Sequence, residues 1–147
     1  AQARVVDRGG GVRALDESGE RDGIDFLVDA YCGVGLFSIA SHRDFEECAG
    51  IEISEQAVRA AKENAELNGA HNCRFEAGTA SNIFDTVSDF DPSRTAVVID
   101  PPRKGCDDNF LQQLLAWGPR RLVYVSCDPS TQARDARKLV SGDVDAT

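Results

Sequence analysis

The sequence lacks the features that would place it in a membrane, build a metal site or cross-link it by disulfides. No apolar run approaches the roughly 20 residues that span a bilayer, and no charged start leads into a hydrophobic stretch as in a signal peptide. The five cysteines form no C-x-x-C pair, and only two histidines accompany them. We therefore expect an intracellular protein in a reducing compartment, without a metal site or a membrane anchor, but the residues do not distinguish cytoplasm, nucleus and mitochondrion.

Positive charge is also scarce in this chain. The 147 residues include 16 Lys and Arg against 25 Asp and Glu, which gives a net charge of −9. Proteins that bind nucleic acid unaided are usually basic, because contacts with phosphate groups dominate their affinity. We therefore expect the chain alone to bind RNA or DNA weakly. The sequence has no methionine, even at position 1, which fits either N-terminal processing or a fragment of a longer protein.

From residue 24 onwards, short apolar segments alternate with segments rich in helix-forming residues. The strand-like segments are apolar throughout, which is typical of a parallel sheet that helices cover on both faces. We predict one α/β domain over residues 24–147, with a doubly wound parallel sheet of about five strands. Residues 1–23 are polar and contain three successive glycines, so they are expected to form a linker or disordered tail. The expected strands are 25–30, 48–53, 73–77, 95–100 and 121–126, and the expected helices begin after Gly35 and span 55–68, 107–117 and 130–140.

Parallel sheets bind ligands at the carboxyl ends of their strands, and the first such end reads "DAYCGVG". Gly33 and Gly35 allow the backbone to approach a ligand, and Glu52 at the end of the next strand can bond two ribose hydroxyls. A dinucleotide site favours G-x-G-x-x-G, but Ser38 replaces the third glycine, which weakens the case for a bound pyrophosphate. S-adenosylmethionine has a ribose but no phosphate, and its cationic sulfonium tolerates acids such as Asp29. A tight turn beside a solvated glutamate is the structural alternative.

The fourth expected strand ends in "DPPRKG" at residues 100–105. Two prolines stiffen the loop behind Asp100, which suits a group that holds a flat substrate. Arg103 and Lys104 add positive charge that can contact a phosphate. A rigid connection between strand and helix, with an aspartate cap, is the structural alternative here.

The fifth expected strand ends on Cys127, directly before a helix with Pro129 in its first turn. The dipole and free N–H groups of a helix start favour a thiolate, so this cysteine can act as a nucleophile. Asp128 opposes this effect, because a neighbouring carboxylate disfavours a second negative charge. The other four cysteines are interpreted as unreactive core residues, with a small reservation for Cys106, which also follows a strand-end loop.

Four segments in order, "DAYCGVGLFS", "GIEIS", "VVIDPPRKGC" and "VYVSCDPSTQARD", resemble the S-adenosylmethionine-dependent RNA 5-methyluridine methyltransferases. The eukaryotic, fungal-like branch that modifies tRNA uridine-54 looks most similar, and the resemblance covers about residues 25–140. It implies a Rossmann-like class I methyltransferase domain and methyl transfer to C5 of a uridine through a covalent adduct between a cysteine and C6. By this resemblance Cys127 is the nucleophile, and Asp100 helps to position the cofactor and the target base.

The resemblance also implies contacts with the cofactor S-adenosyl-L-methionine and with RNA. The residues expected at the cofactor are Asp29, Tyr31, Gly33, Gly35, Glu52, Thr79 and Asp100, and those expected at the RNA are Arg103 and Lys104. The expected substrate is tRNA, bound by a monomer with help from RNA-binding modules outside this chain.

The sequence departs from the family pattern at several points. Asp128 stands where the family usually has asparagine, and residues 1–23 contain no match for its glutamine-bearing cofactor segment. The family's general-base glutamate lies in a C-terminal segment beyond Thr147, so we expect a catalytic core that is incomplete at the C-terminus, with about five strands instead of seven.

Three other functions stay open at this point. The substrate can be rRNA rather than tRNA, since the modules that would discriminate are missing. The chain can also be a non-catalytic fragment that binds the cofactor or a partner protein, which the missing base and Asp128 favour. A dinucleotide-dependent oxidoreductase is disfavoured by the absent third glycine and by the lack of an obvious hydride-relay residue.

Overall fold

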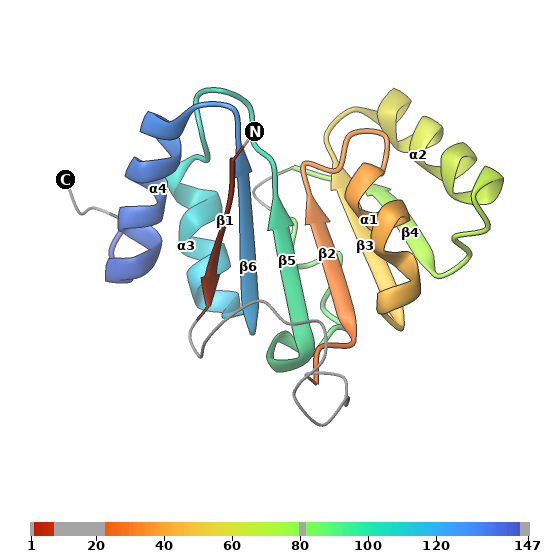
Figure 1. Cartoon of the computed structure of the whole chain (residues 1–147), viewed down its shortest axis with the longest axis horizontal. Coiled ribbons are helices and arrows are strands. Elements are labelled where there is room, and N and C mark those ends of the chain that lie inside the picture. Colours follow the sequence, from red (N-terminus) through yellow and green to blue (C-terminus); the bar gives the residue numbers. More distant parts are fainter. Residues whose placement is uncertain (1, 8–22, 80–81, 145–147) are drawn as a thin grey trace.

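The computed structural model describes residues 2–7, 23–79 and 82–144, and within them six strands form a single sheet (Figure 1). Their order across the sheet is β1-β6-β5-β2-β3-β4. The strands β2 to β6 are parallel to their neighbours, and β1 pairs antiparallel with β6. The strands are β1 (Gln2–Asp7), β2 (Phe26–Ala30), β3 (Glu47–Glu52), β4 (Cys73–Ala77), β5 (Thr95–Ile99) and β6 (Arg121–Ser126). The predicted doubly wound, Rossmann-like sheet with five parallel strands is therefore confirmed.

Helices connect the parallel strands, and local capping signals mark where they begin. Ser54 accepts a hydrogen bond from the Ala57 amide at the start of α2, and Asp107 caps α3 in the same way. Within the described residues, each helix is too short or too polar to cross a lipid bilayer. The helices are α1 (Leu36–Ser41), α2 (Glu55–Leu67), α3 (Asp108–Trp117) and α4 (Pro129–Ser141), with short 3-10 turns at η1 (His42–Asp44) and η2 (Pro92–Arg94).

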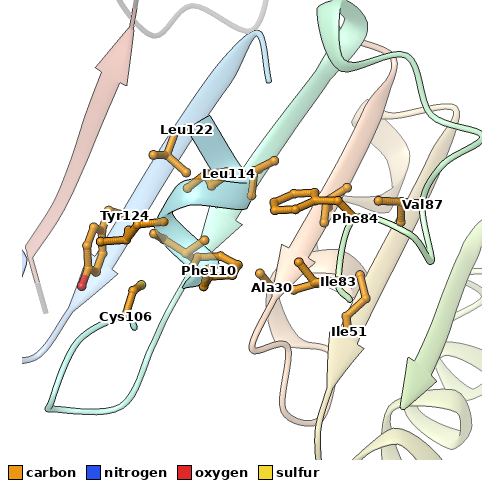
Figure 2. Packing of buried hydrophobic residues seen from close by; sticks show 14 of the residues in the cluster. Ala30, Ile51, Ile83, Phe84, Val87, Cys106, Phe110, Leu114, Leu122 and Tyr124 are labelled. Atoms are coloured by element: carbon orange, nitrogen blue, oxygen red, sulfur yellow. The ribbon is translucent and has the colours of Figure 1, made fainter. Parts of the chain in front are cut away.

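Both faces of the central strands β2, β3 and β5 are buried, as their apolar residues predict, whereas only alternate residues of β6 are buried. On one face, Val28 and Ile99 belong to a cluster that includes Phe110 and Leu114 of α3 (Figure 2). On the other face, Phe75 packs with three residues of α2: Val58, Ala61 and Ala65. These two layers fix the strand ends, so the loops that follow β2, β3, β5 and β6 all emerge at one edge of the sheet.

One part of the fold differs from the sequence prediction, and one core segment lies where the sequence predicted no element. The predicted linker over residues 1–23 contains strand β1 at Gln2–Asp7, while residues 8–22 lie outside the described residues. The stretch from Ile83 to Phe90 has no helix or strand, yet Ile83, Phe84 and Val87 are buried in the core (Figure 2). In both places long-range packing, which a local pattern does not reveal, decides the structure.

Candidate cofactor and nucleophile site

A cleft of about 430 Å³ opens at the carboxyl edge of the sheet, between the loops that follow β2, β3 and β5. The structure brings four of the predicted residues together in its wall: Tyr31, Glu52, Asp100 and Lys104. Sequence reasoning did not assign six other lining residues, which are Ile51, Ile53, Gly78, Pro102, Gly105 and Asp107. Ile53 carries the clearest missed signal, because it is a large apolar residue, 73% exposed, directly behind the acid that ends β3.

The glycine turn after β2 is anchored by Glu52. The Gly33 amide donates to one carboxylate oxygen of Glu52 at 3.1 Å, and the Ser54 amide donates to the other at 3.0 Å. A Cβ on Gly33 would meet no atom within 4 Å, so the turn leaves open space at this position. Gly35 has a φ of 88°, and a Cβ there would lie 2.9 Å from the Phe75 ring. One carboxylate thus fixes the turn, and both glycines are required by its shape.

Tyr31 lines the cleft in an unusual backbone conformation. Its φ of 64° is the one positive value among the described non-glycine residues, and such a conformation costs on the order of 1 kcal/mol. The ring packs edge-on against Phe110, with 5.3 Å between ring centroids. Burial raises the pKa of the Tyr31 hydroxyl, which therefore stays protonated.

Asp29 supports the site from behind and does not line the cleft. The side chain is fully buried, and one carboxylate oxygen accepts both the amide and the hydroxyl of Ser38 at 3.0 Å. Its other oxygen, Oδ1, has no hydrogen-bond partner among the described residues. Burial raises the pKa of Asp29 to about 6, against the opposing effect of the Ser38 bonds. Ser38 stands where the G-x-G-x-x-G motif has its third glycine. The bond from its hydroxyl to Asp29 is one that glycine, which has no side chain, cannot make.

Replacing Asp29 by asparagine should remove part of the pH dependence of stability. The pKa is raised from 3.8 in the unfolded chain to about 6 in the folded one, so the protonated form stabilises the fold. That contribution is complete below about pH 4 and is lost as pH rises through about 6, by up to about 3 kcal/mol. Urea unfolding of both chains between about pH 4 and 7 measures it. If the free energy of unfolding of Asp29→Asn did not rise relative to that of the wild type as the pH increases, this prediction would be wrong.

The remaining predicted cofactor and RNA residues lie around the cleft. Asp100 directly follows β5 and is an exposed residue. Neighbouring atoms shield part of its carboxyl group from water, which raises the pKa of that group. Arg103 and Lys104 are exposed on the same loop. Thr79 is not among the residues that line the cleft. Its amide and hydroxyl both donate to the Asn82 side chain, at 2.9 and 3.1 Å. Its neighbour Gly78 occupies the cleft wall instead.

Cys127 differs from every other cysteine of the chain in being exposed. Cys32, Cys48 and Cys106 are buried, Cys73 is partly buried, and burial raises the pKa of each of these four thiols. Within the described residues, no cluster of three His, Cys, Asp or Glu side chains could hold a metal ion. Exposure at the end of β6 therefore makes Cys127 the thiol that a substrate can reach.

Asp128 serves as the N-cap of α4. Its Oδ1 accepts the Ser130 amide at 2.9 Å, the Ser130 hydroxyl at 2.6 Å and the Thr131 amide at 3.4 Å. These bonds from Ser130 lower the pKa of Asp128, so its carboxylate is charged at neutral pH. The Ser126 hydroxyl donates to the Asp128 carbonyl and accepts the Asp128 amide, both at 3.0 Å. Cys127 is therefore held in a short, internally bonded turn, and the cap explains why this position needs an oxygen acceptor.

Changing Asp128 to alanine should lower Tm by a few degrees, because the first turn of α4 loses its cap. Changing it to asparagine should leave Tm close to that of the wild type, since Oδ1 of asparagine can accept the same bonds. Thermal unfolding followed by circular dichroism measures both. Equal losses of Tm in the two variants would show that the charge, and not the cap, is what stabilises the helix.

This open, mostly parallel sheet, with a glycine turn behind one strand and an acid at the end of the next, has the architecture of the Rossmann-like class I methyltransferases. The family model of the tRNA (Uracil-5-)-methyltransferases matches residues 13–143, and the chain belongs to this family. The predicted resemblance is thereby confirmed.

Fungal relatives support the finer resemblance. The tRNA (uracil(54)-C(5))-methyltransferase of Schizosaccharomyces pombe is 52% identical over 116 residues, which cover 79% of this chain and 22% of that protein. The corresponding protein of Saccharomyces cerevisiae is 48% identical over 117 residues, which cover 80% of this chain and 18% of that protein. The chain thus spans about a fifth of the length of these two curated relatives.

A solved structure agrees with the sequence comparisons. The Pyrococcus abyssi tRNA (uracil-54, C5)-methyltransferase, in complex with S-adenosyl-L-homocysteine, superposes with a TM-score of 0.69 at 33% identity. The match covers 78% of this chain and 28% of the archaeal one. An rRNA methylase from Streptococcus thermophilus has a TM-score of 0.64 at 18% identity, which shows a common fold alone.

Proposed function

We propose that the chain is the catalytic core of an S-adenosylmethionine-dependent enzyme that methylates C5 of a uridine in tRNA. The observation that carries the proposal is the exposed Cys127 at the end of β6, next to β5, whose end carries Asp100 beside the cleft. The names of the fungal relatives support tRNA over rRNA as the substrate and position 54 as the target.

The residues of the cleft fit S-adenosylmethionine. Its wall carries three acidic side chains, Glu52, Asp100 and Asp107, which suit a ligand with a positively charged sulfur. Glu52 can still accept ribose hydroxyls, because each of its oxygens is engaged by one amide and has a second lone pair. The open space at Gly33 leaves room for a ligand against the turn. The bound cofactor supplies an electrophilic methyl group on a sulfonium.

Cys127 makes the uracil ring reactive enough to accept that methyl group. Its thiolate would add to C6, and the electron pair of the C5–C6 double bond would move onto C5. This carbon would then take the methyl group as the methyl–sulfur bond breaks, with the electron pair of that bond left on the departing thioether. The proton on C5 leaves to a general base, a role that the matched motifs give to no residue of this chain. Elimination of the thiolate restores the double bond. The covalent step uses a nucleophile on the protein, as expected for a target carbon of low intrinsic reactivity.

Asp100, Arg103 and Lys104 hold the RNA in this proposal. The Asp100 carboxyl group, whose pKa is raised, faces the cleft and provides a polar contact for the target base. The two basic residues on the same loop contact phosphates, and the net charge of −9 makes this RNA binding weak and strongly salt-dependent. The target base must leave its stack to reach Cys127.

Trapping with 5-fluorouridine tests the proposal. Fluorine at C5 blocks the loss of a proton, so the adduct with Cys127 accumulates even without a general base. The chain is incubated at low salt with S-adenosylmethionine and tRNA carrying 5-fluorouridine at position 54, and covalent complexes are resolved on a denaturing gel. We expect a complex whose crosslink maps to Cys127, and a matched rRNA fragment as the control should give little. Binding of S-adenosylhomocysteine without any adduct would favour a non-catalytic cofactor-binding fragment.

A further inference from the structure

The loop that carries Asp100 and Lys104 is fastened to helix α4 by two side chains of that helix, Arg134 and Asp135, which we call the α4 clamp. Nη2 of Arg134 donates to the Lys104 carbonyl at 3.0 Å, and the Cys106 amide donates to Asp135 Oδ2 at 2.8 Å. In Figure 1 the loop after β5 passes over the carboxyl end of β6 towards the start of α4. The clamp therefore joins the end of β5 to the helix that begins just after Cys127.

The clamp joins a buried carboxylate to an exposed guanidinium. Asp135 is completely buried, and its Oδ1 accepts Nε and Nη2 of Arg134, whose side chain is 48% exposed, at 2.8 and 2.7 Å. Its Oδ2 also accepts the Tyr124 hydroxyl at 2.7 Å. An ion pair with one solvent-exposed partner adds little net stability, because water screens the attraction. Its contribution is therefore better sought in the geometry that it imposes.

Gly105 shows how closely the loop fits the clamp. Its φ is 80°, and a Cβ there would lie 2.5 Å from both Arg134 Nη2 and Asp135 Oδ2. The next residue, Cys106, belongs to the buried core cluster that includes Tyr124, and Tyr31 packs against that cluster. Because Tyr31 lines the cleft, the same set of contacts extends from α4 to the loop behind β2.

We propose that Arg134 and Asp135 are positioning residues that hold Asp100 and Lys104 in a fixed place relative to Cys127. The proposal rests on the proposed function, since it takes Cys127 as the nucleophile and Asp100 as a contact of the target base. β5 and β6 are neighbours, with Ile99 opposite Tyr124, so the Asp100 loop and Cys127 extend from adjacent strands. Without the clamp the loop keeps its prolines and the bond from the Gly105 amide to the Pro102 carbonyl at 2.8 Å, but it loses its link to α4. A displacement of about 1 Å can slow a positioned reaction by about 100-fold.

The test compares three variants with the wild-type chain. Arg134→Lys keeps a positive charge beside Asp135. It loses the branched guanidinium group, which bonds Asp135 and the Lys104 carbonyl at the same time. Asp135→Asn removes the carboxylate, and Arg137→Lys serves as the matched control, because Arg137 lies on the same helix, is exposed and undergoes the same change of side chain. For each, we measure Tm, S-adenosylhomocysteine affinity, hydrogen exchange of the loop amides, and the rate of adduct formation with 5-fluorouridine tRNA as a function of RNA concentration.

For Arg134→Lys we expect faster exchange at Gly105 and Cys106, and a maximal adduct rate lower by about 10- to 100-fold. The RNA concentration at half-maximal rate and the cofactor affinity should stay within about threefold of the wild type. Arg137→Lys should leave both Tm and the adduct rate close to those of the wild type. If Asp135→Asn fails to fold, Arg134→Lys alone decides the question.

Two outcomes would overturn the clamp proposal while leaving the proposed function intact. One is a wild-type rate in a folded Arg134→Lys chain. The other is a rate in Arg137→Lys reduced as much as that in Arg134→Lys, since the loss would then not depend on the contacts between Arg134 and the loop. A wild-type chain that binds S-adenosylhomocysteine but forms no adduct would count against the proposed function itself, and the positioning role for that reaction would be rejected with it.

Discussion

Replacing Cys127 by alanine should abolish the covalent complex with 5-fluorouridine tRNA. The thiol is exposed at the end of β6, and alanine offers no atom that can add to C6 of the base. The side chain takes part in no packing cluster, so Tm and the affinity for S-adenosylhomocysteine should stay close to those of the wild type. Serine at this position should also give no complex above background, because its hydroxyl is a much weaker nucleophile at neutral pH. Denaturing gels and mass spectrometry of the crosslinked peptide measure the result.

Cys73→Ala is the matched control for this experiment. Cys73 is the next most accessible thiol, on β4, where it donates to the Ser38 carbonyl at 3.5 Å. Its removal should leave the yield of the complex unchanged. Cys106→Ala tests the second cysteine that follows a strand-end loop, and burial raises the pKa of its thiol to about 12, so we expect it to be no nucleophile. A complex that survives in Cys127→Ala and disappears in one of these variants would assign the nucleophile elsewhere.

The sequence predicted the parallel core because its signals there are local. Apolar strands bounded by glycine and proline, and helices preceded by a side-chain acceptor such as Ser54, can be recognised from a few neighbouring residues. The exposure of Cys127 follows from the same signals, since a residue between a strand end and a helix start must lie at the edge of the sheet. Glu52, Tyr31 and Asp100 meet in the cleft for the same reason.

Features that depend on contacts between distant segments were beyond the reach of the sequence. Strand β1 pairs with β6 at the other end of the chain, and nothing in its own residues specifies that partner. The sequence predicts Asp29 at the cofactor, but it does not reveal that Ser38 donates to this carboxylate or that Asp29 is buried behind the turn. It predicts the "QARD" segment as part of a helix and of the family resemblance, but it does not reveal the contacts of this segment with a loop 30 residues away.

Replacing Glu52 by alanine should weaken the binding of S-adenosylhomocysteine by about 10- to 100-fold. The carboxylate accepts the amides of Gly33 and Ser54 and is the expected partner of the ribose hydroxyls. One hydrogen bond to a charged group contributes about 1.5–3 kcal/mol, which corresponds to about 10- to 100-fold in affinity. Without the Glu52 carboxylate the glycine turn loses its anchor, and the ribose hydroxyls lose their expected acceptor. Both effects weaken binding at the same place. Isothermal titration calorimetry on the 147-residue chain measures the affinity directly.

Glutamine at position 52 separates anchoring from charge. Its single carbonyl oxygen can accept one of the two amides, while its NH₂ group faces the other donor, so we expect an affinity between those of the wild type and Glu52→Ala. Glu55→Gln is the control, because it removes the same charge from an exposed residue at the start of α2 that pairs only loosely with Arg59, at 3.7 Å. If Glu55→Gln weakened binding as much as Glu52→Gln, the result would show that the overall negative charge of the chain attracts the ligand. Glu52 would then not be a specific contact of the cofactor. Unchanged affinity in Glu52→Ala would move the cofactor away from the cleft and remove the main support for the proposed function.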